Sequence, residues 1–361
     1  MVPEGVKEIR SRAFENCTSV NCIEIPTTVE KIGCDAFSGC KNLTKVDIPT
    51  SVTIIGSDVF ECCYKLADNQ GMIIINKILF KFFGKDKNVV VPEGVEEIFS
   101  LAFDENRFIQ KIILPHSLLR IGYGAFRSCK QLVSVKLKKG LKEISDSAFL
   151  GCDKLKDIKI SPSVSFPNDL GCNEAFRFCK SLADENGFVI VNNILFDYFG
   201  RKKKVTVPDG VKTIQSRAFC GCNSITSIYI PKSVTEIRDY AFLSCSRLVE
   251  VVFSEGLLHV GKAAFQSCEN LKEIVLPNSL IEIGEAAFDK GVLFLNKNDT
   301  KECDKLVCNE YNIIKNIWNC YSPYIKGKKN DIEKFFEKRK IDPSLLEDYK
   351  AEGAIVSFEL T

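Results

Sequence analysis

The sequence predicts a mainly β solenoid of the α/β class, in which coils of about 23 residues stack on one another. Three observations predict it. An Ala-Phe dipeptide recurs at a fixed period, apolar residues alternate before a proline in each repeat, and two longer repeats each contain a hairpin pattern. A period in this range is typical of solenoids, because one such repeat cannot bury its own apolar side and needs neighbours to cover it.

The repeat is counted from the phenylalanine of each Ala-Phe (once Val-Phe) dipeptide, which is position 0. The steps between successive phenylalanines are 23, 23, 43, 23, 23, 27, 43, 23, 23 and 23 residues. The phenylalanines at position 0 are Phe14, Phe37, Phe60, Phe103, Phe126, Phe149, Phe176, Phe219, Phe242, Phe265 and Phe288. Eleven occurrences of one pattern indicate a repeat architecture.

The repeat that follows Phe37 shows where a strand is expected. Position +6 is apolar in every repeat, and the pair at +9 and +11, here Val46 and Ile48, precedes Pro49. The alternation predicts a short strand with +9 and +11 inward and +8 and +10 outward. Proline lacks an N–H group and ends the strand. Stacked repeats should join these strands into one long parallel sheet.

The two steps of 43 residues contain inserted segments, at 67–88 and 183–204. Each has two apolar stretches around an Asn-Lys or Asn-Asn pair, which predicts a β-hairpin. We expect each hairpin to project from the solenoid before the strand at +9. The two segments lie 116 residues apart, which indicates a higher-order duplication.

The pattern divides the chain into a solenoid over 1–291 and a C-terminal region over 292–361. The end of a solenoid exposes its core, so we interpret the C-terminal region, with Trp318, Phe335 and Phe336, as a cap. The alternative is a separate functional domain. At the other end, Val2 and Pro3 match positions +11 and +12, so we expect the chain to begin within a repeat, with any signal peptide upstream of it.

Composition excludes several function classes. The net charge is +2, too small to indicate DNA, RNA or an anionic membrane as a partner, and the basic run at 200–205 is interpreted as a solvated loop. The longest apolar runs are too short to span a bilayer, so no membrane insertion is expected. The first residues also show no secretory signal.

The pattern AFxxCxxLxxIxIPxSVxxIGxxAF resembles the BspA-like class of leucine-rich repeats over residues 1–294. The segment DENGFVIVNNILFDYFG resembles an interruption common in that family. The resemblance implies a leucine-rich-repeat solenoid, right-handed, with one strand face and one irregular face. It also implies a surface or secreted protein of bacteria or protists that serves adhesion or binding. The family shares no catalytic residues.

Nine of the 17 cysteines occupy position +3. We expect a buried column there, with cysteine acting as a small hydrophobic residue. Neighbouring cysteines could lie within disulfide range, but side chains in a parallel ladder point the same way, which favours free thiols. The remaining cysteines show no Cys-x-x-Cys pair and no nearby histidine, so no zinc site is expected.

Catalysis is not expected either. His116 and His259 fall in turn or loop positions without an obvious Ser, Cys or Asp partner in the sequence. The chain also lacks G-x-S-x-G, H-E-x-x-H and a phosphate-binding glycine loop. We therefore predict no enzyme activity, no cofactor and no metal.

The outward positions +8 and +10 are where binding residues are sought. Column +10 reads Glu24, Asp47, Val90, Ile113, Lys136, Lys159, Thr206, Tyr229, Val252 and Val275. It turns from acidic to basic and ends apolar. Exposed apolar patches tend to mark contact sites, so the candidate ligand-binding residues are Ile113, Tyr229, Val252 and Val275. The alternative is that β-branched residues simply suit a sheet surface.

Two functions remain open at this point. The first is a non-enzymatic scaffold, at the cell surface or secreted, that binds a protein or extracellular-matrix ligand through its strand face, aided by the hairpins. The second is an intracellular structural or adaptor repeat protein, which the free thiols and the absence of a visible signal favour.

Overall fold

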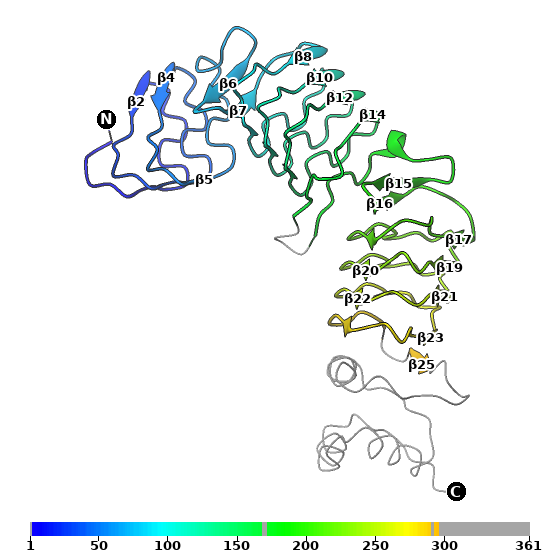
Figure 1. Ribbon diagram of the computed structural model, residues 1–361. Coiled ribbons are helices and arrows are strands. Elements are labelled where there is room, and N and C mark those ends of the chain that lie inside the picture. Colours follow the sequence, from blue (N-terminus) through cyan, green and yellow to red (C-terminus); the bar gives the residue numbers. More distant parts are fainter. Residues whose placement is uncertain (1, 168–171, 290–291, 296–361) are drawn as a thin grey trace, which may run out of the picture. The chain divides into compact units, whose positions relative to one another are not determined.

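A computed structural model of the chain describes residues 2–167, 172–289 and 292–295, which form stacked β coils (Figure 1). The chain divides into an N-terminal unit, Met1–Asp184, and a C-terminal unit, Glu185–Thr361. Equivalent strands of successive coils pair in parallel within each unit, which confirms the predicted solenoid. The proposed cap lies outside the described residues, apart from one short strand, and stays a prediction.

In the N-terminal unit the coils supply two sets of strands. The strands from positions +8 to +10, called the first ladder, form two separate sheets: β2 (Cys22–Glu24) with β4 (Lys45–Asp47), and β8 (Asn88–Val90), β10 (Lys111–Ile113), β12 (Ser134–Lys136) and β14 (Asp157–Ile158). The strands from positions +17 and +18, called the second ladder, are also divided between two sheets: β1 (Glu8–Ile9), β3 (Lys31–Ile32) and β5 (Ile54–Ile55) in one, and β9 (Glu97–Ile98), β11 (Arg120–Ile121) and β13 (Glu143–Ile144) in the other. One short 3-10 helix, η1 (Lys180–Leu182), follows.

The C-terminal unit repeats this arrangement. Its first ladder consists of two separate sheets, β17 (Lys204–Thr206), β19 (Ser227–Ile230) and β21 (Glu250–Phe253) in one, and β23 (Glu273–Val275) with β25 (Leu293–Leu295) in the other. Its second ladder comprises β18 (Thr213–Ile214), β20 (Glu236–Ile237), β22 (His259–Val260) and β24 (Glu282–Ile283). One long parallel sheet was therefore the wrong expectation. The residues at +17 and +18 are also extended, and they pair with the equivalent residues of the next coil. The apolar side chain at +18 of these strands points toward the core.

The two inserted segments contain antiparallel strand pairs. These are β6 (Met72–Ile75) with β7 (Ile78–Phe82), and β15 (Phe188–Val191) with β16 (Ile194–Tyr198). They do not project from the solenoid as expected. β7 pairs in parallel with β9, and β16 with β18, so each second strand takes a place in the second ladder. The apolar residues of these strands favour the core over an exposed position.

Aromatic rings fill the core in a column. Neighbouring phenylalanines at position 0 stack with centroid separations from 4.6 Å (Phe242–Phe265) to 5.8 Å (Phe37–Phe60). Phe82 packs against Phe103 at 4.9 Å, and Tyr198 against Phe219 at 5.2 Å. On its other side the first inserted segment meets the column through Phe80, which lies edge-on to Phe60 at 5.4 Å. Both inserted segments therefore contribute aromatic rings to the column.

The cysteines at position +3 do more than fill space. The Sγ atom of Cys129 donates a hydrogen bond of 3.0 Å to the carbonyl oxygen of Phe103, one coil earlier. The same bond, at 3.0–3.2 Å, is made by Cys40, Cys63, Cys152, Cys179, Cys245 and Cys268. All seven are buried. Where asparagine takes the position, Asn106 donates to Gly84 instead. Each of these carbonyls also accepts a backbone N–H within its own coil, as Phe103 does from Asn106 at 3.0 Å. The thiol is therefore a second donor, and its bond links one coil to the next.

Candidate functional site

The strand face is the surface formed by the outward side chains of the first ladder. The strands β2, β4, β8 and β10 each have an exposed, a buried and an exposed residue in succession. Residues at +8 and +10 therefore share the outer side, as the alternation predicts. Each unit carries its own part of this face, and the two parts are treated separately.

In the C-terminal unit the strand face carries an apolar patch. Tyr229 of β19 and Val252 of β21 are partners in the ladder, and they are 42% and 40% exposed. Val275 of β23, the next strand, is half-buried. The Oγ atom of Ser254 donates a hydrogen bond of 2.7 Å to the Tyr229 hydroxyl oxygen. That bond ties the ring to its neighbouring coil, so the aromatic surface is held in place.

Acidic side chains border this patch. Glu250 of β21 accepts a hydrogen bond of 2.7 Å from the Ser227 hydroxyl, and Glu273 is exposed on β23. Both lie at position +8, beside the apolar residues at +10. The C-terminal part of the strand face therefore pairs a fixed aromatic ring with carboxylates.

The fourth predicted residue, Ile113, lies in the N-terminal unit. It pairs with Val90 across β10 and β8, and the two are 36% and 58% exposed. The expected candidate set is therefore distributed over two patches. Val90 was not among the predicted binding residues, although it stands in the same column and is more exposed than Ile113. The apolar side chain of Val90 at an outward position of the repeat would have been enough to include it among the candidate binding residues.

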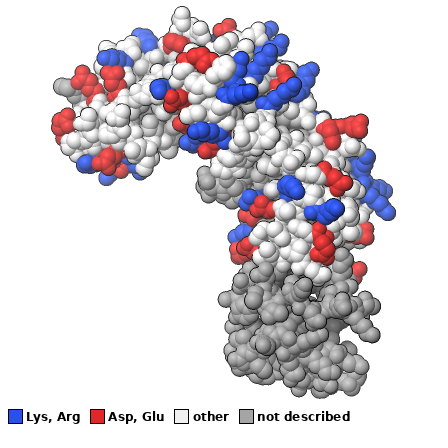
Figure 2. Space-filling view, in the orientation of Figure 1, with Lys and Arg blue, Asp and Glu red and all other residues white. Residues whose placement is uncertain are grey.

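Charge on the N-terminal part of the face changes from strand to strand. On β4, Lys45 and Asp47 form an ion pair of 3.2 Å, and the hydrogen bond between them raises the pKa of Lys45. Farther along, Lys111, Lys136 and Lys159 are exposed. Figure 2 shows lysine and arginine side chains gathered over the part of this unit that carries β8, β10 and β12.

Comparison with family models identifies the repeat. A model of the BspA type leucine rich repeat region, in six copies, matches residues 1–84, 69–183 and 189–297. The chain belongs to this family. The resemblance drawn from the Ala-Phe repeat is therefore confirmed.

Solved structures of leucine-rich repeat proteins are similar to this BspA-type chain. A leucine rich cell surface protein from Faecalibacterium prausnitzii is 27% identical, with 78% of this chain and 74% of that chain covered and a TM-score of 0.42. A leucine-rich repeat protein from Bacteroides ovatus is 26% identical, with coverage of 81% and 76% and a TM-score of 0.40. A leucine-rich repeat protein of T. pallidum is 28% identical, with coverage of 54% and 82% and a TM-score of 0.32. The curated proteins include no match.

The two histidines of the BspA-type repeat lie beside glutamates of neighbouring coils. The His116 Nδ1 atom lies 3.1 Å from Glu93, and hydrogen bonds from His116 lower the pKa of Glu93. His259 lies 3.3 Å from Glu282. Both pairs are surface contacts between equivalent positions of adjacent coils. They bring no nucleophile beside the imidazole, and within the described ranges no three His, Cys, Asp or Glu side chains gather where a metal could bind.

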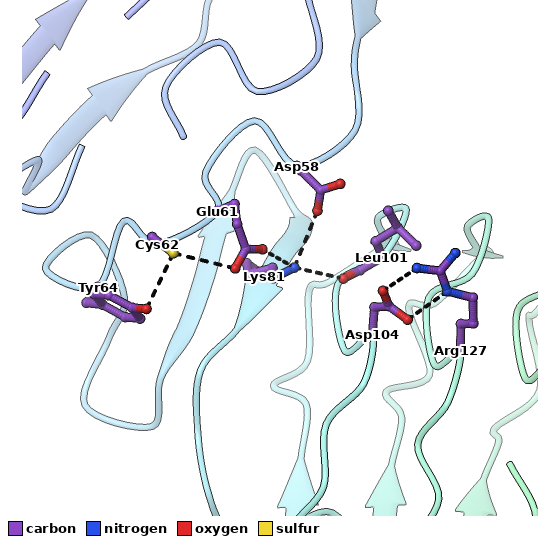
Figure 3. A network of polar contacts seen from close by, with 8 residues as sticks. All are labelled: Asp58, Glu61, Cys62, Tyr64, Lys81, Leu101, Asp104 and Arg127. Atoms are coloured by element: carbon purple, nitrogen blue, oxygen red, sulfur yellow. Dashed lines mark hydrogen bonds and ion pairs between the residues drawn. The ribbon is translucent and has the colours of Figure 1, made fainter. Parts of the chain in front are cut away.

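The Lys81 cluster is the most connected polar group shown in Figure 3. The Lys81 ammonium contacts Glu61, lies 3.4 Å from Asp58 and donates to the Leu101 carbonyl oxygen at 3.3 Å. Burial raises the pKa of Asp58, against the opposing effect of Lys81. Lys81 belongs to β7, and its partners belong to the coils on either side. The cluster therefore holds the inserted segment in the stack, and sequence patterning did not reveal it.

No helix among the described residues has the length and apolar character needed to cross a membrane.

Proposed function

We propose that this BspA-type chain is a non-enzymatic scaffold that binds protein or extracellular-matrix ligands through its strand face. The observation that carries the proposal is the exposed pair Tyr229 and Val252, two apolar side chains on paired strands. Aromatic residues that are held in place offer contact area at low entropic cost, and they are enriched where interfaces gain most of their energy. The repeated coils supply the extended surface that such scaffolds use.

A cell-surface or secreted location is part of the same proposal, and membership of the BspA-type family supports it. The second candidate is an intracellular structural or adaptor protein. The free thiols favour it, because buried cysteines such as Cys40, Cys63 and Cys129 form no disulfide, and unpaired thiols are typical of reducing compartments. Antibody labelling of intact and permeabilised source cells separates the two. Labelling of intact cells supports the surface protein, and labelling only after permeabilisation overturns that location.

The binding proposal is tested with the double variant Tyr229→Asp and Val252→Asp. Purified wild-type and variant chains are compared on an array of purified extracellular-matrix proteins, with binding followed by surface plasmon resonance. The variant should lose binding to any matrix protein that captures the wild type, because two carboxylates would be desolvated at the contact. Unchanged binding would mean that the patch serves only to form the sheet.

A matched control changes two apolar residues of similar exposure that lie off the strand face. Tyr123 and Ile281 are 39% and 36% exposed and occupy positions −3 and +16. Tyr123→Asp with Ile281→Asp should leave binding intact. If both double variants lose binding equally, the strand face is not the binding surface.

A further inference from the structure

The N-terminal part of the strand face carries lysines that the fold leaves unneutralised. Lys111 lies on β10, Lys136 on β12 and Lys159 directly after β14. All three are exposed, and within the described part of the chain none forms an ion pair with a carboxylate. This differs from β4, where Asp47 neutralises Lys45. The acidic residue nearest to them in register, Asp157, instead accepts a hydrogen bond of 2.7 Å from Ser134.

These lysines lie next to an exposed apolar pair, Val90 and Ile113, on the same sheet. Ile113 is the register partner of Val90 on one side and of Lys136 on the other. Lys111 and Ile113 share the outer side of β10. Parallel strands lie about 4.8 Å apart, so the four strands from β8 to β14 span roughly 14 Å. Four or so residues of an extended polypeptide, at about 3.3 Å each, cover that distance.

We propose that this surface binds an extended acidic polypeptide segment that also carries apolar side chains. The segment crosses β8, β10, β12 and β14, with its apolar side chains on Val90 and Ile113 and its carboxylates on Lys111, Lys136 and Lys159. The inference rests on the proposed function, since it names the chemistry of a partner for the same strand face. It concerns the N-terminal unit alone and does not use Tyr229 or Val252.

The apolar pair is what favours a polypeptide over other polyanions. A sulfated polysaccharide would satisfy the lysines, but it would place charged and hydroxyl groups on Val90 and Ile113. Covering an exposed apolar pair is favourable only when the partner is itself apolar at that point. A segment with both kinds of side chain satisfies the whole surface.

Three polyanion probes of matched length distinguish these possibilities. They are a random copolymer of glutamate and tyrosine, poly-glutamate, and heparin fragments. Binding to the full chain is measured by fluorescence anisotropy at several NaCl concentrations. The copolymer should bind at least about fivefold more tightly than poly-glutamate, and its affinity should fall as salt screens the lysines.

Two sets of variants locate the site. Lys111→Glu with Lys136→Glu and Lys159→Glu should weaken copolymer binding by about tenfold or more, since each reversal replaces attraction by repulsion. Val90→Ser with Ile113→Ser should weaken the copolymer but leave poly-glutamate unchanged. The control, Lys41→Glu with Lys130→Glu and Lys142→Glu, applies the same change in net charge to exposed lysines at positions +4 and +16, and should have little effect.

The inference is overturned if heparin or poly-glutamate binds as tightly as the copolymer, if the control triple variant loses as much binding as the first, or if no probe binds. The variant Tyr229→Asp with Val252→Asp keeps this result separate from the broader proposal. If matrix ligands depend on Tyr229 and Val252 while the copolymer does not bind, only the acidic-partner inference fails. If neither patch affects any ligand, the proposed function fails as well.

Discussion

At the scale of single residues, the cysteine column shows what a residue pattern can and cannot predict. The recurrence of cysteine at +3 predicted a buried column, and seven of the nine cysteines are buried, whereas Cys17 and Cys222 are half-buried. The bond from each buried thiol to a phenylalanine carbonyl was not predictable, because donor and acceptor are 26 residues apart, or 30 for Cys179, and lie in different coils. Only the offset between stacked coils brings them together.

The same bonds predict which thiols react. Cys129 and Cys152 are buried and donate to carbonyl oxygens, and burial raises the pKa of both thiols. Cys22 and Cys34 are exposed. Because the thiolate is the nucleophile, Cys22 and Cys34 should be alkylated by iodoacetamide at pH 8 while Cys129 and Cys152 stay unmodified until the chain is denatured. Peptide mass mapping reads this out, and rapid modification of the buried pair in the native chain would contradict it.

Burial of these thiols also predicts a loss of stability in alkaline solution. The pKa of Cys63 and of Cys129 is raised to about 12 in the folded chain, whereas an unfolded thiol titrates near 8.5. Below about pH 8.5 both states keep the proton and stability is full. Above it only the unfolded state loses the proton, so stability falls up to about pH 12, by at most roughly 1.4 kcal/mol per pH unit for each thiol.

Urea unfolding at several pH values between 8 and 11 tests this, with Cys129→Ala as the variant. The variant should have a lower free energy of unfolding at pH 8, by about 0.5–1.5 kcal/mol, because the hydrogen bond from the thiol to the Phe103 carbonyl is lost while the Asn106 N–H still donates to that carbonyl. Its stability should then fall less steeply with pH than that of the wild type. Cys22→Ala, at an exposed position, serves as the control and should follow the wild type. Parallel curves for Cys129→Ala and the wild type would show that the thiol does not titrate as inferred.

At the scale of elements, the inserted segments were predicted only in part. The Asn-Lys and Asn-Asn pairs have positive φ angles at both residues, as a tight two-residue hairpin turn requires. The turn depends only on these two residues, so it could be predicted from the sequence. The pairing of β7 with β9 depends on a strand about 20 residues downstream and on Phe82 entering the ring column, at a spacing that differs from the 23-residue period.

Lys81 should be the residue that holds β7 in place. Its ammonium has three partners from neighbouring coils and its side chain is mostly buried. Lys81→Met should reduce the free energy of unfolding by roughly 2–4 kcal/mol, somewhat below the cost of breaking a fully buried pair because Asp58 and Glu61 keep some contact with solvent. Lys77→Met, which breaks only the exposed pair with Glu96, should cost at most about 1 kcal/mol.

The cost of Lys81→Met should also depend on pH. Without the ammonium, the carboxylates of Asp58 and Glu61 lose their counter-charge, and burial already raises the pKa of Asp58. A carboxyl whose pKa is higher in the folded chain favours folding as it takes up its proton. The difference between variant and wild type should therefore shrink from pH 7 to about pH 4. An equal difference at both pH values would show that lost packing, and not charge, causes the destabilisation.

At the scale of the whole molecule, the period predicted the architecture because stacking is dictated by local repetition. Each coil contacts only its neighbours, so an apolar pattern repeated every 23 residues is enough to specify a solenoid. The period does not predict how the stack of coils ends. Residues 292–361 depart from the repeat, so the cap and the boundary at 291 stay predictions.

A stack of this kind should respond locally to a change in its core. Phe242 is fully buried and stacks on Phe219 at 4.7 Å and on Phe265 at 4.6 Å. Phe242→Leu removes both stacking contacts, each worth about 0.5–1.5 kcal/mol beyond burial. Because stability in a repeat array is a sum of coil and neighbour contributions, amide exchange should quicken in the core cluster between Phe188 and Val292. The core cluster between Ile9 and Phe80 should keep its protection.

Hydrogen exchange followed by mass spectrometry measures this coil by coil. Phe108→Leu is the control, since Phe108 is an exposed phenylalanine of the N-terminal unit and its loss should leave exchange unchanged in both clusters. Equal acceleration in the two clusters of Phe242→Leu would mean that the stack unfolds as one cooperative block. Acceleration confined to the C-terminal unit would mean that each coil is stabilised chiefly by its neighbours, so a strand-face variant in one unit can be assayed without disturbing the other.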